Sequence, residues 1–322
     1  MALLSISDLR ARVDETINQS LSTRFVNTIP EIEPNYYIDL LPQIVQKENG
    51  DSKNMNMAIC SKTKKIGVFE ADTNDFTNFL IENRVRTVGI LDPHCTFRTF
   101  NGASVLEVKN QIRSYLKSNT NLMKPEEMTV SSFVFQGKER FFGYASMLSS
   151  HSRTQISARF KNFLESGGSI VSVQDRVLPI TRFVADKEKM IMNPKQSILF
   201  CELSDHAIQF WIVVNFDDQL LSPLVSELSG ELSKSADWMS SVDFLVNSVV
   251  MQTEKQHQLW SPTLAVFIDN TNFKDHVYDD AVYQGILGLL SKACGKVVEL
   301  RSSEHRNASL LGAFLLKGGE LD

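Results

Sequence analysis

The residues whose types could do chemistry are concentrated in a short hairpin in the second half of the chain. Within Ser197–Phe216, two apolar runs that read as strands are joined by the polar turn Leu203–His206. A nucleotide enzyme keeps an aspartate and glycines in such a turn, because a carboxylate holds magnesium and a glycine lets a backbone N–H approach a phosphate. This turn has no glycine, and Glu202 is the best candidate for the carboxylate. We therefore predict a nucleotide-type hairpin without its catalytic residues.

Other groups of reactive side chains have simpler explanations. The chain has no Gly-x-Ser-x-Gly elbow, and Ser149–Ser152 fits a helix cap better than serine catalysis. The histidines lack the spacing of a zinc motif, which favours solvated or core side chains and no metal site; they are His94, His151, His206, His257, His276 and His305. The densest acidic group does not match a calcium loop, so a solvated face is favoured over a cation site; it contains Asp269, Asp275, Asp279 and Asp280.

Composition describes a globular protein large enough for two domains. The chain has 322 residues, of which 43% are hydrophobic and 22% are charged. Its net charge of −5 is spread along the sequence without a basic stripe, which argues against nucleic acid as a partner. The four cysteines are widely separated, as expected for reduced, buried thiols in a cytosolic protein. The longest apolar stretch near the C-terminus, Ala308–Leu316, is too short to span a bilayer, so we expect no direct membrane insertion.

The elements that must position these residues begin after an N-terminal segment. Residues 1–52 are predicted to form a helical arm and a linker, which either packs on the protein's own body or binds a partner chain. Ser7 can cap a helix with apolar residues on one face, namely Leu9, Val13, Ile17 and Leu21. Prolines then interrupt the segment before the polar linker, at Pro30, Pro34 and Pro42.

Residues 53–190 are predicted to form a first α/β lobe with an insertion. A hairpin around the turn Ser61–Lys64 is followed by a helix after Thr73 and by a strand. The insertion, at about residues 95–147, reads as a strand, a helix and a hairpin turned at Gly137–Lys138. A helix that ends at Gly167–Gly168 and one more strand then return the chain to the first lobe.

Residues 191–322 repeat this logic more clearly. After the hairpin come a short third strand, a helix, a strand, a helix, a strand and a final helix, an order typical of a ribonuclease-H-like half. The predicted ranges after the hairpin are 219–221, 236–256, 264–269, 282–290, 296–300 and 307–315. Two such halves in tandem predict an α/β, actin-like (ASKHA) two-lobed fold with an inserted β-α-β-β subdomain and a cleft between the lobes.

Three passages carry a resemblance to a known family, and they occur in the family's order. The first is CTFRTF with the helix LEVKNQIRSYL and the turn PEEM. The second runs from FFGYASM to SGGSIVSV, and the third from AVFIDNTNF to NASLLGAFLL. Together they resemble the PilM/GspL group, the cytoplasmic actin-like proteins of type IV pilus and type II secretion assembly platforms. The resemblance covers about residues 55–316.

The resemblance implies a place in the cell and a set of partners. It implies a cytoplasmic protein that associates peripherally with the inner membrane through other proteins. The implied partners are a bitopic inner-membrane assembly protein and an assembly ATPase, and a homodimer stays open.

The departures from the family concern nucleotide chemistry. ATP-binding members have glycine turns at three places that here read CSKTKK, CELSDH and IDNTNF. Because no glycine remains to cradle a phosphate, we expect no cofactor and no ATPase activity. If nucleotide binding survived, ATP with magnesium would contact Ser61, Lys62, Glu202, Ser204, Asp205 and Asn270.

Aromatic residues of the inserted hairpin are candidates for partner binding. They alternate along two strands, which places those of each strand on one face; the four candidates are Phe133, Phe135, Phe142 and Tyr144. We expect one face of the insertion to pack on its own helix, and the other could take a peptide or form more core.

The leading hypothesis is therefore a catalytically inert scaffold of a pilus or secretion machine that docks on membrane assembly proteins. One alternative is a divergent ASKHA-type ATPase or kinase. The other is a different α/β interaction protein.

Overall fold

The computed structural model describes most of the chain after the N-terminal segment, and the predicted helix after Ser7 lies outside the described residues. The described ranges are 34–46, 52–71, 73–93, 96–120, 131–136, 141–147, 150–187, 196–204, 207–216, 219–229, 238–251, 261–270, 280–300 and 307–316. None of the helices in these ranges has the length and apolar content needed to cross a membrane.

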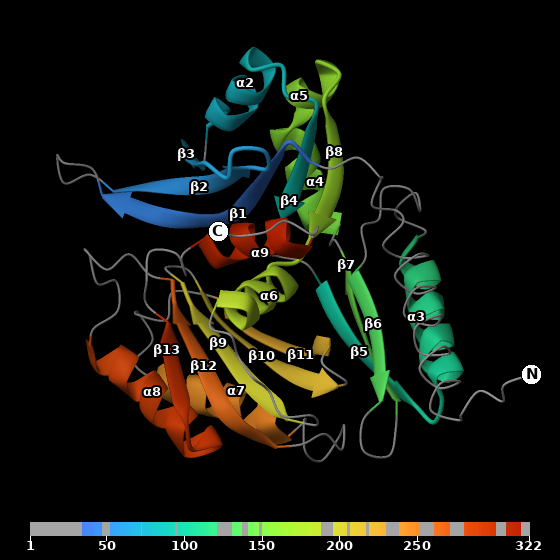
Figure 1. Ribbon diagram of the computed structural model, residues 1–322, viewed down its shortest axis with the longest axis vertical. Coiled ribbons are helices and arrows are strands. Elements are labelled where there is room, and N and C mark those ends of the chain that lie inside the picture. Colours follow the sequence, from blue (N-terminus) through green and yellow to red (C-terminus); the bar gives the residue numbers. More distant parts are fainter. Residues whose placement is uncertain are drawn as a thin grey trace, which may run out of the picture.

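The described residues form two five-stranded sheets that share one topology (Figure 1). The first sheet has the order β3-β2-β1-β4-β8 and the second the order β11-β10-β9-β12-β13. In each sheet the first strand of the half lies in the middle, antiparallel to the second and parallel to the fourth. The strands are β1 (Tyr36–Gln46), β2 (Ser52–Cys60), β3 (Ile66–Glu70), β4 (Thr87–Leu91), β8 (Ser169–Gln174), β9 (Ser197–Leu203), β10 (Ala207–Phe216), β11 (Gln219–Ser229), β12 (Pro262–Asp269) and β13 (Val297–Leu300).

Strand β1 corrects the predicted boundary of the N-terminal arm. The predicted arm includes residues 36–46, but these residues form the central strand of the first sheet. Pro42 is tolerated there because the pairing with β2 is irregular between Asp39 and Gln43. A proline cannot donate to a regular ladder, but at a bulge no ladder bond is required of it. The first lobe therefore begins before residue 53.

The insertion forms a separate three-stranded sheet of order β5-β7-β6, built from β5 (Thr96–Gly102), β6 (Ser131–Gln136) and β7 (Phe141–Met147). Helix α3 (Val105–Thr120) contacts all three strands, and Phe100 packs with Val108 and Ile112 in the core of the first lobe. Strand β11 of the second lobe also contacts the three strands. The inserted sheet therefore joins its own helix to both lobes.

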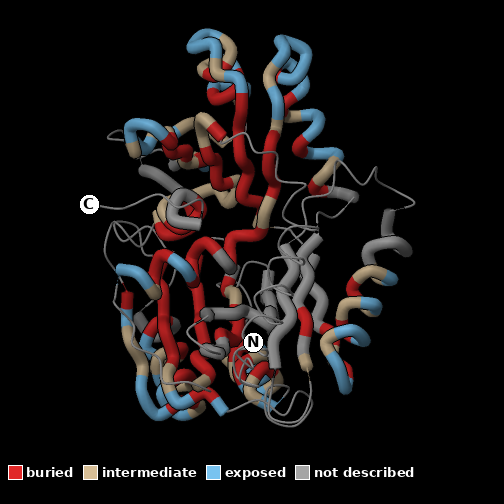
Figure 2. Tube along the Cα trace, turned by 45° about the vertical axis from the view of Figure 1, so that its right-hand side comes forward, coloured by how far each residue is buried: buried red, intermediate tan, exposed pale blue. Residues whose placement is uncertain are grey.

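Each large sheet is covered by helices on both faces, as its apolar strands require. On the first sheet, α2 (Asp75–Glu82), α4 (Ser150–Arg159) and α5 (Lys161–Glu165) supply core residues to one face, including Phe76, Ile156 and Phe163. On the second sheet, α7 (Trp238–Met251) and α8 (Asp280–Cys294) cover one face. Figure 2 shows the middle strands of both sheets as buried segments, with exposed residues on the outer helices and turns.

The last helix of each half packs on the sheet of the other half. Helix α6 (Val177–Lys187) follows β8, yet Ile180 and Phe183 belong to the core beneath the second sheet. Helix α9 (Ala308–Leu316) ends the second half, yet Leu310 and Ala313 pack on the first sheet. The two helices contact each other between the sheets (Figure 1). The boundary predicted at residues 190 and 191 therefore separates α6 from the sheet on which it packs.

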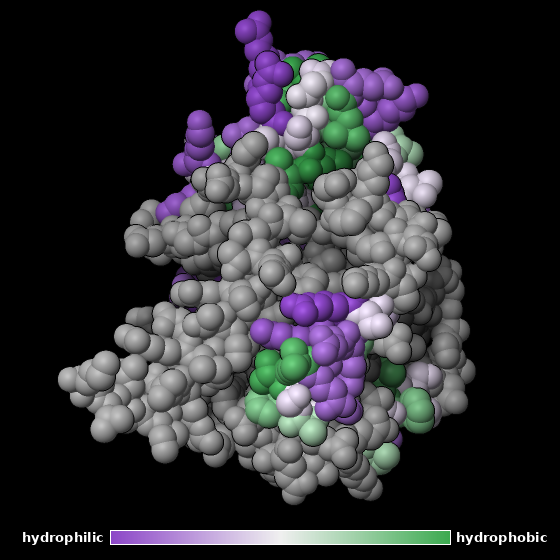
Figure 3. Space-filling view, turned by 90° about the vertical axis from the view of Figure 1, so that its right-hand side faces the viewer, coloured by the Kyte–Doolittle hydropathy of each residue, from purple (hydrophilic) through white to green (hydrophobic). Residues whose placement is uncertain are grey.

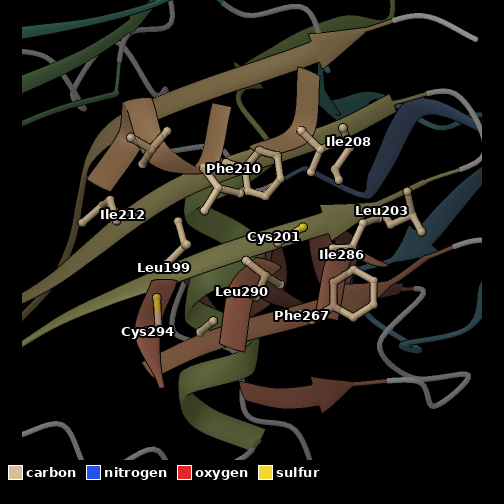
Figure 4. Close-up of a cluster of buried hydrophobic side chains, with 14 of the residues drawn as sticks. Leu199, Cys201, Leu203, Ile208, Phe210, Ile212, Phe267, Ile286, Leu290 and Cys294 are labelled. Carbon is tan, nitrogen blue, oxygen red and sulfur yellow. The ribbon is translucent and has the colours of Figure 1, made fainter. Parts of the chain in front are cut away.

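Two of the three described cysteines are buried, reduced thiols, as the sequence predicts. Cys201 and Cys294 are free thiols within the apolar core of the second lobe (Figure 4). Burial raises the pKa of Cys201 well above its usual value and that of Cys294 to about 12, so both thiols stay protonated near neutral pH. Cys60 is a half-buried free thiol, and Cys95 lies outside the described residues.

Candidate functional site

The candidate site lies where the two sheets face each other through the carboxyl ends of their parallel strands. Open α/β sheets bind ligands in the crevice outside these ends. Asp39 is the last residue of β1 that pairs with β4, and Glu202 pairs with Ile268 near the end of β12. Asp39 lies on β1 and Glu202 lies on β9. These are the central strands of the two sheets, so Asp39 is the first-lobe counterpart of Glu202.

The side chain of Arg176 joins these two carboxylates. Arg176 lies between the end of β8 and the start of α6, and it is 3% exposed. Its Nε donates to Asp39 Oδ2 at 2.8 Å, and Nη1 and Nη2 donate to the two carboxylate oxygens of Glu202 at 2.9 and 3.0 Å. Asp39 is 4% exposed and Glu202 is 2% exposed. A buried guanidinium therefore bridges one acidic residue from each lobe.

Asp39 is held by several further donors. Its Oδ2 accepts from Ser309 near the start of α9, and its Oδ1 accepts from the backbone N–H of Leu41 at 2.9 Å. Asn56 in β2 donates to the Asp39 carbonyl at 2.9 Å, and Asn56 Oδ1 accepts from Arg159 at 2.6 Å. The bulge in β1 brings the Leu41 N–H to the Asp39 carboxylate.

Glu202 is supported by the residue that follows β12. Asn270 Nδ2 donates to Glu202 Oε1 at 2.8 Å, and the Asn270 backbone N–H donates to the Leu203 carbonyl at 2.7 Å. Asn270 Oδ1 is buried and has no hydrogen-bond partner among the described residues. Asn270 thus fixes the Glu202 carboxylate while one of its own acceptors stays unused within the described ranges.

The electrostatics favour a permanent charge on Arg176. Burial alone would lower its pKa, but the charges of Asp39 and Glu202 and their hydrogen bonds outweigh burial and raise the pKa above its usual value. A raised pKa means that the stabilising charge is present below the unfolded-state pKa and is lost only as the pH rises through the folded-state pKa. Both values lie far above neutral, so the guanidinium keeps its charge at working pH. It cannot act as a general base.

The structure brings together only part of the predicted set. Glu202 and Asn270 are in contact, and Ser204 is buried directly after β9. Asp205 lies outside the described residues. Ser61 and Lys62 lie in the turn between β2 and β3, where Ser61 donates to the Pro34 carbonyl before the start of β1.

Ser61 and Lys62 are therefore placed beside the beginning of β1 and not beside Asp39. Cys60 pairs with Tyr36 at the start of β1, whereas Asp39 pairs with Met57. The prediction took the turn between β2 and β3 for the opening hairpin of the lobe, which is instead the hairpin of β1 and β2.

Two central residues were missed by sequence reasoning. Asp39 stands in the apolar run YYIDLL just as Glu202 stands in LFCEL, and this shared pattern is a usable signal. Arg176 had no comparable signal beyond its place between an apolar strand and a helix. For the acidic group the sequence predicts a solvated face, which is wrong for Asp269, because Asp269 is buried; Asp275 and Asp279 lie outside the described residues. In those ranges no cluster of three or more His, Cys, Asp or Glu could hold a metal ion.

Comparisons with known proteins identify the fold. No family model and no curated protein matches the sequence. Among solved structures, the chain is similar to a PilM–PilN type IV pilus biogenesis complex, with 12% identity and a TM-score of 0.52 over 91% of this chain and 100% of that chain. The actin-like two-lobed fold predicted from the layout is therefore confirmed, and the likeness to PilM-type proteins holds at the level of fold.

Two further solved structures have lower scores. A Bacteroides thetaiotaomicron protein with an actin-like ATPase fold and unknown function has 10% identity and a TM-score of 0.45, over 90% of this chain and 98% of that chain. The cytoplasmic domain of EpsL, an inner membrane component of the type II secretion system of Vibrio cholerae, has 8% identity and a TM-score of 0.42, over 89% and 97%.

Proposed function

We propose that this protein is a cytoplasmic scaffold of a type IV pilus or type II secretion assembly platform, that it binds membrane assembly proteins, and that it does not hydrolyse ATP. The observation that carries the platform role is the likeness to a chain of the PilM–PilN complex over that chain's whole length. The ion pairs of Arg176 with Asp39 and Glu202 support the lack of hydrolysis.

The crevice argument rests on the buried pairs of Arg176. Magnesium with a nucleotide would need carboxylates at the ends of the central strands, and these are Asp39 and Glu202. Both are already bound to the guanidinium. Displacing Arg176 would leave a buried charge without its partner, which typically costs about 3–5 kcal/mol. Arg176 therefore replaces the cation of a nucleotide site with a side chain of the protein.

Titration calorimetry with Mg-ATP tests this reading directly. We expect no heat of binding at ATP concentrations up to the millimolar range, because the carboxylates are occupied. Micromolar binding that is lost in Glu202→Gln and Asn270→Ala would instead support the rival reading, a divergent ATPase or kinase. The same titration on Arg176→Met asks whether the arginine alone blocks the crevice.

We propose that the membrane partner binds to the aromatic residues of the inserted sheet. In its register Phe133 pairs with Tyr144, and Phe135 pairs with Phe142, at positions that alternate with Gly143. Gly143 pairs with Phe100, whose ring contacts Tyr115 of α3 at 5.5 Å between centroids. Figure 3 views the molecule from the α3 side, and its described surface mixes hydrophilic with hydrophobic residues. The cytoplasmic segment of a bitopic inner-membrane protein is the proposed ligand, which would keep the scaffold at the membrane surface.

Affinity capture from detergent-solubilised native membranes tests this role. We expect the parent chain to retain a bitopic assembly protein, and Phe135→Ala with Phe142→Ala to reduce capture at least tenfold. Leu106→Ala is the matched control, because Leu106 is 63% exposed on α3 and lies outside the inserted sheet. If the parent captures no bitopic or polytopic assembly component, the proposed function is wrong. An equal loss of capture in the control and the test variant would show that the partner does not bind at these aromatic residues.

A further inference from the structure

Strand β3 forms an edge of the first sheet, and within the described part of the chain it pairs only with β2 (Figure 1). Backbone bonds from Cys60 N to Lys65 O and from Ala71 N to Asn54 O flank the strand. Hydrogen-bonded pairs alternate along an antiparallel ladder. Gly67 and Phe69 therefore direct their backbone groups to β2. The backbone groups of Ile66, Val68 and Glu70 point away from the sheet.

The side chains of β3 are anchored on one face and open on the other. The Phe69 ring lies 4.9 Å from the ring of Phe76 and 5.2 Å from that of Phe79, in helix α2. Ile66 is 36% exposed and Val68 is 46% exposed. Soluble proteins usually protect edge strands with proline, bulges or inward charges, and β3 contains none of these. The strand is thus a rigid edge suited to strand addition.

The charges around β3 indicate what adds to it. Lys62, Lys64 and Lys65 precede the strand, and Glu70 ends it. A parallel partner copy would place like charges side by side, whereas an antiparallel copy places the basic end of one strand beside the acidic end of the other. The strand is therefore electrostatically complementary to itself in the antiparallel direction.

We propose that β3 pairs antiparallel with β3 of a second copy of this chain, around a twofold axis at Gly67. In this register Ile66 of each copy faces Val68 of the other, and the outward backbone groups of these two residues form the ladder bonds. Lys64 lies in the turn before β3, where its N–H donates to the Cys60 carbonyl at 2.9 Å, so it contributes its side-chain charge beside Glu70 of the other copy and no ladder bond. Glu70 already forms an ion pair with Lys53, and its side chain is 28% exposed, which leaves room for a second cation.

The contact joins two five-stranded sheets into one continuous sheet across a closed, isologous interface. Because each copy contributes one short strand, the buried area is below that of a standard interface. We expect dimers at protein concentrations on the order of 10–100 µM, as for weak interfaces of this size. This dimer does not depend on the proposed platform role.

Sedimentation velocity on the full chain tests the proposal through charge reversal. Lys64→Glu and Glu70→Lys should each leave the chain monomeric at concentrations where the parent dimerises, because like charges then meet at both ends of the paired strands. An equimolar mixture of the two variants should dimerise again, and so should the double variant K64E/E70K. Thermal unfolding of each single variant checks that the monomer stays folded.

Val68→Lys provides a second test that does not use the ion pairs. It should abolish dimerisation, whereas Leu164→Lys, at a residue 39% exposed in α5, should leave it unchanged. A parent that stays monomeric at these concentrations overturns the proposal. So does a dimer that persists in V68K or K64E, or a mixture that fails to restore it; persistence would place the interface elsewhere.

Discussion

Replacing Arg176 with methionine is expected to lower the free energy of unfolding by about 3–5 kcal/mol. The substitution removes the guanidinium but leaves Asp39 and Glu202 buried, each with a carboxylate whose strongest partner is gone. Methionine keeps much of the side-chain volume, so the loss reports charge rather than a cavity. Urea unfolding measures the free energy. The thermal midpoint should fall by several degrees, at about 2–4 °C per kcal/mol.

Two further variants separate the ion cluster from simple packing. The triple variant D39N/R176M/E202Q removes every charge of the cluster and should recover a large part of the loss, because no unpaired charge remains. Arg176→Lys keeps the charge but cannot bind Glu202 through two parallel bonds, so it should fall between the parent and R176M. A triple variant no more stable than R176M would contradict the charge argument.

The second lobe could be predicted from the sequence apart from its third strand, which runs over Gln219–Ser229 and not only over 219–221, whereas the first lobe could be predicted only in part. In the second lobe, the mostly apolar runs 197–203 and 207–216 contain no proline, and the later helices follow clear periodicity. In the first lobe, Pro42 lies inside β1, and a proline at such a position suggests that no strand continues through it. Its strand is nevertheless regular up to Asp39, where the bulge begins. Missing β1 shifted the assignment by one strand and put Ser61 where Asp39 belongs.

The cluster itself could not be read from local pattern. Arg176 contacts Asp39 across 137 positions and Glu202 across 26, and Ser309 contacts Asp39 across 270. Helix α6 was also missed, because Pro179 suggests a turn although a proline is tolerated in the first turn of a helix. Only the exchange of α6 and α9 between the sheets brings these residues together.

That exchange makes the contact between α6 and α9 a further link between the lobes, next to the ion cluster. Both helices begin at the cluster, with Arg176 just before α6 and Ser309 in the first turn of α9. Together with the contact between β11 and the inserted sheet, these two contacts set the relative position of the lobes. A change that separates the two helices should disturb both.

Gly312→Ala is expected to lower the free energy of unfolding by about 3 kcal/mol, at the upper end for overpacking. A Cβ at Gly312 would lie 1.8 Å from the Pro179 carbonyl oxygen and 2.4 Å from its carbon. Because these are backbone atoms of α6, no side-chain rotation relieves the clash, and the helices must move apart. Gly288→Ala is the matched control: Gly288 also lies within a helix, and a Cβ there meets nothing within 4 Å. It should stabilise the protein by about 0.5–1 kcal/mol, because alanine is the better helix former. Unfolding curves for the two variants should therefore shift in opposite directions, and equal shifts would mean that α6 and α9 do not cross at Gly312.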